Sequence, residues 1–313
     1  MKRIAFSLAV GMIAAAAAAQ GTGQAGQQAT PAAGQAAPAT QTPTPKRPPQ
    51  TKTQPEFDAW KAADAVSRPS AEEQATAQKS PGDAQQVQAA VSARTEKAAD
   101  DFAVKFPESE VRILLYKAAM RNYQNDNNAE KTEAMGRKVL GFDADDPEAL
   151  VTVAQVISER TRDSDLDRDQ RYDEAVKMAQ KSLTTVDTDL QVPAGTPQER
   201  IDAYKSGLRS QAYYAMGTIE YNKGNFASAQ GNLEKSIDAF PSQPDPVAVL
   251  RLALALDKQD KYPEALKVAT RAVELTPEGS QVGVLARRER DRLQQLAGGA
   301  TTPAQPQAQP PKN

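Results

Sequence analysis

Two neighbouring segments of the chain repeat one pattern of large and small side chains, and this repeat constrains the fold more than any other feature. Residues 213–241 and 249–277 each contain two helical patterns, joined by a short polar turn and closed by a proline. In the first segment, the small residues Gly217 and Ala229 allow two helices to approach closely, while larger side chains fill the space beside them. A single helix pair cannot bury its own apolar faces, so three or more units are expected to stack. The sequence therefore predicts an all-α stack of helix pairs.

The pattern resembles the tetratricopeptide repeat, in which a large residue, a Leu-Gly pair, an alanine, an aromatic residue, a second alanine and a proline recur at fixed offsets. The matching residues are Tyr213, Met216, Gly217, Phe226, Ala229 and Pro241 in one unit and Tyr262, Ala265, Ala272 and Pro277 in the next. Two weaker units precede them. Residues 147–187 carry an insertion at the turn, and residues 111–146 lack the aromatic and the small residue at the expected positions. The arrangement also resembles that of exported bacterial repeat proteins with a Pro/Gln-rich leader.

The resemblance covers residues 83–297 and implies a right-handed superhelical solenoid of about four helix pairs with flanking capping helices. The units are expected at 111–146, 147–187, 210–243 and 246–279, followed by a capping helix at 281–296. That helix should turn Val282, Leu285, Leu293 and Leu296 inward. Residues 196–199, Thr-Pro-Gln-Glu, are typical of a capping box at a helix start.

The chain contains no cysteine and no histidine. This excludes cysteine nucleophiles, Ser-His-Asp triads, disulfides and the usual zinc sites. The formal net charge of -2 lacks the basic surplus of a general nucleic-acid binder. Carboxylates are abundant, but no pair stands out by its spacing as suited to acid–base chemistry, and no glycine-rich phosphate loop is present. We therefore expect neither an enzyme nor a nucleic-acid-binding protein. We also expect no cofactor, with a weakly bound calcium ion as the one alternative.

The two ends of the chain are expected to lie outside the packed body. Residues 1–19 combine the charged start Lys2-Arg3 with an apolar run and a small-residue cleavage site, which is typical of a signal peptide. Residues 20–55, rich in Ala, Gln, Pro and Thr, and the tail 298–313 are predicted to be disordered. No later segment could span a bilayer. The protein is therefore expected to be exported, either to the periplasm or out of the cell.

Residues 56–82 are expected to form a short helix followed by a linker. Phe57, Trp60 and Ala63 are spaced for one helical face. This face either docks on the main body, which we favour, or engages a partner.

In tetratricopeptide proteins the first helix of each unit lines a concave groove in which peptide or helix ligands lie. Repeat register then implies that seven residues face this groove: Tyr116, Tyr123, Gln155, Tyr214, Thr218, Tyr221 and Asn222. Tyr116 and Tyr123 in the first unit, and Tyr214 and Tyr221 in the third, form two pairs. The two tyrosines of each pair lie about two helical turns apart and so share one face. Tyrosine gives a flat contact area with a polar tip, which suits an interface. The alternative is that these tyrosines pack between repeats.

The insertion at 161–171 carries alternating acidic residues. Asp163, Asp165, Asp167 and Asp169, together with Glu174, match the oxygen ligands of a calcium loop of EF-hand type. Arg168 stands where that loop needs a glycine for its sharp turn. A solvated loop is therefore the simpler interpretation, and a weak calcium site is the alternative.

The leading hypothesis is an exported scaffold that binds a protein or peptide partner in its concave groove, within a cell-envelope assembly. A calcium-stabilised structural envelope protein is the alternative. An enzyme acting on envelope glycans or peptides ranks third.

Overall fold

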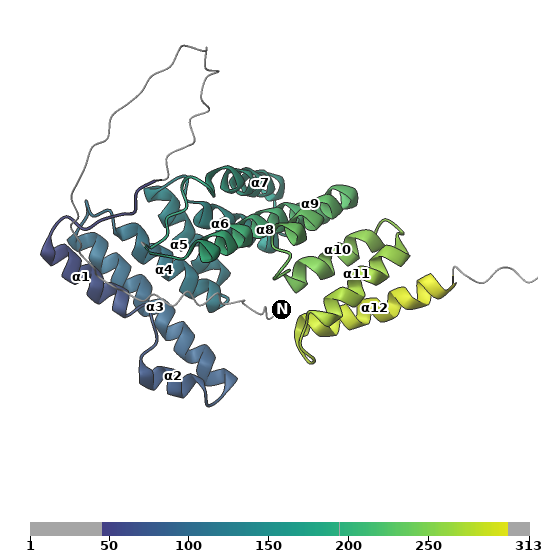
Figure 1. The fold of residues 1–313 in the computed structure, drawn as a ribbon, viewed down its shortest axis with the longest axis horizontal. Coiled ribbons are helices and arrows are strands. Elements are labelled where there is room, and N and C mark those ends of the chain that lie inside the picture. Colours follow the sequence, from purple (N-terminus) through teal and green to yellow (C-terminus); the bar gives the residue numbers. More distant parts are fainter. Residues whose placement is uncertain (1–45, 194, 300–313) are drawn as a thin grey trace, which may run out of the picture. The chain divides into compact units, whose positions relative to one another are not determined.

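The computed structural model describes residues 46–193 and 195–299, and within them the chain is helical without any strand (Figure 1). The helices are α1 (Gln54–Ala65), α2 (Ala71–Ala77), α3 (Pro81–Lys105), α4 (Arg112–Asn125), α5 (Ala129–Phe142), α6 (Pro147–Arg160), α7 (Arg168–Thr185), α8 (Gln198–Asn222), α9 (Phe226–Ala239), α10 (Pro246–Asp257), α11 (Tyr262–Glu274) and α12 (Gln281–Gly299). The all-α expectation is confirmed. None of the described helices is both long and apolar enough to cross a membrane.

Eight of these helices pair into four consecutive hairpins, α4 with α5, α6 with α7, α8 with α9, and α10 with α11. Each hairpin also packs against the next one, so the described chain is a tetratricopeptide-like stack, as the resemblance implied. Two of the hairpins begin with the same device. Asp146 and Asp245 each accept a hydrogen bond at 2.9 Å from a backbone N–H of the first turn, and each is followed by a proline. Proline is tolerated there because its missing N–H has no intrahelical partner.

Close approach of α8 and α9 requires a residue without a side chain at position 217. A Cβ added to Gly217 would lie 2.8 Å from Leu233 Cγ and 3.3 Å from the Leu233 backbone nitrogen. Leu233 and Ala229, on the facing side of α9, are fully buried. The small residues of the repeat therefore act as the sequence pattern predicted.

The helix α8 differs from the expectation in two ways. α8 begins at Gln198, well before the expected unit start at 210, because Tyr204 and Leu208 pack into the same core as α6 and α7. The capping box expected at 196–199 is not formed. The Thr196 hydroxyl instead donates to the Pro193 carbonyl at 2.7 Å, and no side chain caps α8.

The segment expected as one short helix and a linker contains two helices. α1 docks on α3 and α4, with Trp60 and Ala63 against the core, so the favoured docking is confirmed. α2 was not expected. Ser70 and Glu73 form a capping box at its start, and Arg94 of α3 binds the Glu73 carboxylate.

The capping helix α12 packs on α11 and α10, but its inward face is narrower than predicted. Leu293 and Ala286 are fully buried and Val282 is partly buried, whereas Leu285 and Leu296 are exposed. Positions 282, 286 and 293 share a face at helical spacing, and Leu285 lies off that face.

Residues 46–53, which we call the strap, run against the helical body although the sequence places them in a disordered linker. The Lys46 backbone N–H donates to the Thr188 carbonyl at 3.0 Å, and Lys46 Nζ lies 2.6 Å from Asp143 Oδ1. The guanidinium of the next residue, Arg47, lies 2.7 Å from Glu110 Oε1. Composition predicts disorder here because the strap has no apolar residues to bury. Composition takes no account of the distant acidic residues with which the strap pairs. The signal peptide 1–19, residues 20–45 of the linker and the last part of the tail lie outside the described residues.

Candidate interaction surface

The groove tyrosines of the first unit are covered by α3. Tyr116 and Tyr123 are each 5% exposed. Their hydroxyls donate to Asp100, at 2.7 Å, and to Glu96, both on α3. Burial raises the pKa of both phenols, and the two carboxylates raise it further. These two tyrosines pack between helices, as the alternative interpretation held, and they are not available to a ligand.

In the third unit, two of the predicted groove residues are also buried. Tyr214 is 2% exposed and Thr218 is fully buried, and the hydroxyl oxygens of both lack a hydrogen-bond partner among the described residues. Such a group costs free energy unless water or a ligand satisfies it.

The other three predicted groove residues are partly buried. Asn222 donates to the Ser158 carbonyl at 3.2 Å and to the Tyr172 hydroxyl at 3.3 Å, which ties α8 to α6 and α7. Gln155 donates to Glu159 on its own helix. Tyr221 keeps part of its ring in solvent and meets Phe226 edge-on at 5.4 Å between ring centroids.

A residue that the sequence analysis missed crosses from α10 to these tyrosines. The Arg251 guanidinium lies 5.5 Å from the Tyr214 ring centroid and 6.0 Å from that of Tyr221. Both distances are within the range of a cation–π interaction. Burial raises the pKa of Tyr221, while the positive charge of Arg251 opposes this rise. We call Arg251, Tyr214 and Tyr221 the arginine–tyrosine surface.

Arg251 is only partly buried, and it has no ion-pair partner among the residues that the structure describes. A guanidinium carries its N–H donors in one rigid planar fork, which can bind a carboxylate through two parallel hydrogen bonds. The sequence signal was available, because Arg251 is a single cation within the otherwise apolar stretch from Pro246 to Leu256.

The acidic residues of the insertion do not converge. Among the described residues, no three carboxylates lie close enough together to hold a metal ion. Asp163 and Asp169 face Arg168, and an oxygen of Asp165 accepts the Arg162 backbone N–H at 2.9 Å. Glu174 is bound by both terminal nitrogens of Arg137 from α5, at 2.7 and 3.1 Å. The structure also places Asp167 at the start of α7 without a side-chain cap, so the described residues do not show the convergent arrangement that the alternative calcium interpretation requires of these five residues.

A cluster of charges, buried except for the exposed side chain of Arg121, joins the first helices of three hairpins. Lys117 Nζ lies 2.7 Å from Asp146 Oδ2 and 3.0 Å from Glu148 Oε2, and Arg121 binds Glu148 through two nitrogens. Arg121 also donates to the Tyr204 hydroxyl of α8 at 3.3 Å. Burial alone would raise the pKa of Glu148, but the charges of Arg121 and Lys117 outweigh it and hold that pKa well below its usual range. The cluster is internally paired, and this pairing ties α4, α6 and α8 together.

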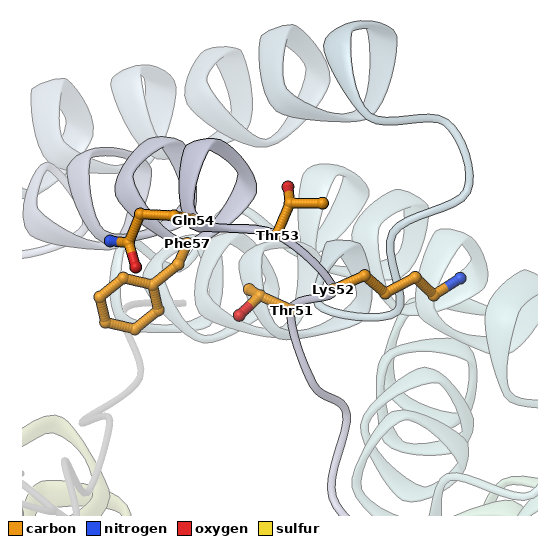
Figure 2. Close-up of a pocket in the computed structure, with 5 residues that line it drawn as sticks. All are labelled: Thr51, Lys52, Thr53, Gln54 and Phe57. Atoms are coloured by element: carbon orange, nitrogen blue, oxygen red, sulfur yellow. The ribbon is translucent and has the colours of Figure 1, made fainter.

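The surface beside α1 is only shallowly hollowed. Figure 2 shows Thr51, Lys52, Thr53, Gln54 and Phe57 around this hollow, with the Lys52 side chain extending away from Phe57. Phe57 is exposed in the structure, whereas its neighbour Trp60 packs against the core. The hollow lacks the enclosed, convergent polar groups of a small-molecule site.

Comparison with known proteins gives likeness only at the level of solved structures. The sequence matches no family model, and no curated protein matches it. A thermophilic TPR protein of Thermus thermophilus is 12% identical, with a TM-score of 0.46 over 75% of this chain and 98% of that one. PilF of Pseudomonas aeruginosa is 15% identical, with a TM-score of 0.46 over 79% and 94%. Acl4, the assembly chaperone of RpL4, is 13% identical, with a TM-score of 0.38 over 79% and 99%. At these values the likeness carries no information on a ligand or a partner.

Proposed function

We propose that the protein is a scaffold that binds a segment of a protein partner on the arginine–tyrosine surface. The observation that carries the proposal is the position of Arg251, which lies near two tyrosine rings of the neighbouring hairpin and has no carboxylate partner among the described residues. Arginine and tyrosine are the residue types that most often supply binding energy at the centre of an interface. A stack of hairpins also offers an extended surface without needing a deep pocket.

The chemistry of this surface indicates what the bound segment carries. A carboxylate would satisfy the Arg251 donors, and an apolar or aromatic side chain beside it would cover the exposed part of Tyr221. Tyr214 and Thr218 add two buried hydroxyls on the same helix face, and neither has a hydrogen-bond partner among the described residues.

A role without catalysis fits the charge distribution. The buried carboxylate Glu148 is matched by Lys117 and Arg121, and the chain has no histidine or cysteine to act as base or nucleophile. A calcium-stabilised structural protein is less well supported, because Asp163, Asp165 and Asp169 face an arginine or the backbone.

Site-specific photocrosslinking in cells would test the proposed surface. A benzophenone amino acid at position 221 is expected to yield an adduct with the partner, whereas the same group at exposed Arg271 of α11 should yield none. With the partner purified, Arg251→Ala is expected to weaken binding at least about tenfold and Arg251→Lys nearly as much, because lysine lacks the fork. Arg271→Ala is the matched control. Equal affinity of the Arg251→Ala and Arg271→Ala variants, both fully helical, would reject the surface.

Export and a role in the cell envelope belong to the same proposal. They rest on the signal-peptide pattern of residues 1–19. Cell fractionation followed by amino-terminal sequencing should find the protein outside the cytoplasm and starting at Gln20. An intact start at Met1 in the cytoplasmic fraction would contradict export.

A further inference from the structure

The strap crosses the connections that lead from one helix pair to the next. Its contacts fall on the α3–α4 connection at Glu110, the α5–α6 connection at Asp143, and the α7–α8 connection at Thr188. We call these three connections the link edge. The basic side chains of the strap therefore meet acidic side chains of the link edge in successive repeats.

The link edge binds the strap through both its side chains and its backbone. Arg47 donates to one oxygen of Glu110 at 2.7 Å, and the Gln50 backbone N–H donates to the other at 3.3 Å. The Lys46 backbone N–H is bound by the Thr188 carbonyl, and Lys52 Nζ donates to the Glu108 carbonyl at 3.2 Å. Pro48 and Pro49 lie between these anchors and favour the extended polyproline conformation. This is the geometry of a bound peptide, supplied here by the chain itself.

The link edge is more than an acidic surface, because one of its carboxylates, Asp143, is buried. Asp143 is 7% exposed, and Oδ1 accepts both Lys46 Nζ and the Asp145 backbone N–H. Its second oxygen, Oδ2, is buried and has no hydrogen-bond partner among the described residues. A buried carboxylate that is half unsatisfied can take a further donor from a cation in the position of Lys46.

We propose that the link edge is a second docking surface, which takes a basic, proline-containing extended segment of a partner, and that the strap occupies it as a displaceable substitute. This goes beyond the arginine–tyrosine surface, because it involves other helices and the opposite ligand charge. The strap can leave because its own cations remain in contact with water. The side chains of Lys46 and Arg47 are 41% and 63% exposed, so water already hydrates part of both cations, and salt screens the more exposed Arg47–Glu110 pair.

A labelled synthetic peptide with the sequence of residues 45–53 tests the proposal on the full chain. In the variant Lys46→Glu/Arg47→Glu, repulsion from Asp143 and Glu110 should free the link edge. Fluorescence anisotropy is expected to show the peptide binding this variant at least about tenfold more tightly than wild type, where the strap competes at millimolar effective concentration. Raising the salt from about 50 to about 500 mM should weaken the binding several-fold.

Two further variants make the result specific. Adding Asp143→Asn and Glu110→Gln to the freed variant should abolish binding, whereas adding Asp163→Asn and Asp169→Asn, which change an equal charge elsewhere, should not. Circular dichroism checks that each variant is folded. If the two glutamates disturb folding, Lys46→Ala/Arg47→Ala replaces Lys46→Glu/Arg47→Glu as the freed variant. No saturable binding to either freed variant, or binding that ignores Asp143 and Glu110, would overturn the proposal. A wild-type dimer that dissociates when the strap is freed would overturn it too, because the occupant would then be a second copy.

Discussion

Two glycines in the same hairpin should respond in opposite directions to one added methyl group. Gly217 lies within α8 and Gly231 within α9, and neither has a positive φ. A Cβ at Gly231 would meet nothing within 4 Å. A Cβ at Gly217 would lie 2.8 and 3.0 Å from two Leu233 side-chain atoms and 3.3 Å from the Leu233 backbone nitrogen.

The magnitudes follow from two opposing terms. Replacing a glycine by alanine within a helix raises the free energy of unfolding by about 0.5–1 kcal/mol, because glycine loses more backbone entropy on folding. At Gly231 this is the whole effect. At Gly217 the new methyl group collides with a fully buried leucine whose backbone is also close, so rotation of Leu233 cannot relieve the contact and α9 must shift. Overpacking of this kind costs about 1–3 kcal/mol. The Gly217→Ala variant should therefore lose about 1–2 kcal/mol net.

Urea unfolding followed by circular dichroism measures both variants against wild type under one set of conditions. We expect the Gly231→Ala midpoint to rise and the Gly217→Ala midpoint to fall, with Tm differences of about 2–4 °C per kcal/mol for a body of this size. If the hairpins unfold separately, the shift should still appear in the transition that involves α8 and α9. A Gly217→Ala variant as stable as the Gly231→Ala variant would refute the close approach of these two helices.

Four further outcomes are expected. Lys117→Met should lower the free energy of unfolding by about 3–5 kcal/mol, measured by urea titration, because it leaves the fully buried Asp146 without its cation and Glu148 with Arg121 alone. Glu148→Gln should flatten the acid limb of the stability–pH curve: the folded pKa of Glu148 is depressed, so its contribution is present above the unfolded value of about 4.3 and is lost as the pH falls below it. Tyr123→Phe, which removes the hydroxyl bound to Glu96, should cost about 1 kcal/mol, whereas Tyr214→Phe, which removes an unpaired hydroxyl, should be neutral or stabilising in the same urea assay. Calcium at about 1 mM should leave the Tm unchanged; a rise that is lost in Asp163→Asn/Asp165→Asn would contradict the described geometry.

The hairpin boundaries could be predicted closely where the chain carries local signals. Asp146 and Asp245, each followed by proline, mark the starts of α6 and α10, and Gly224 marks the end of α8 with a φ of 82°. The early start of α8 was missed because its first turns lie outside the repeat template, although Ile201, Tyr204 and Leu208 are spaced for one helical face. The helix α2 was missed even though Ser70 and Glu73 carry its capping box.

The strap could not be predicted in this way. Its ion pairs join Lys46 to Asp143 and Arg47 to Glu110, residues far apart in the sequence. Composition alone gives disorder, because nothing in the strap is apolar enough to be buried. Only the stacking of the hairpins, which brings the connections together, creates the row of acceptors that it follows.

Repeat register predicts the face on which a side chain lies, but the helix packed opposite decides whether that side chain is exposed. Tyr116 and Tyr123 lie on one face of α4, as predicted, yet α3 covers that face and offers Asp100 and Glu96 to their hydroxyls. The helix α6 is also covered by a neighbouring helix: α8 packs broadly across it, and most of its side chains are buried. α8 and α10, by contrast, meet only sparsely, so Arg251 lies over the tyrosines with part of its surface still in water. Whether a first-helix side chain on this stack reaches solvent therefore depends on the helix packed against it and not on the residues of the repeat itself.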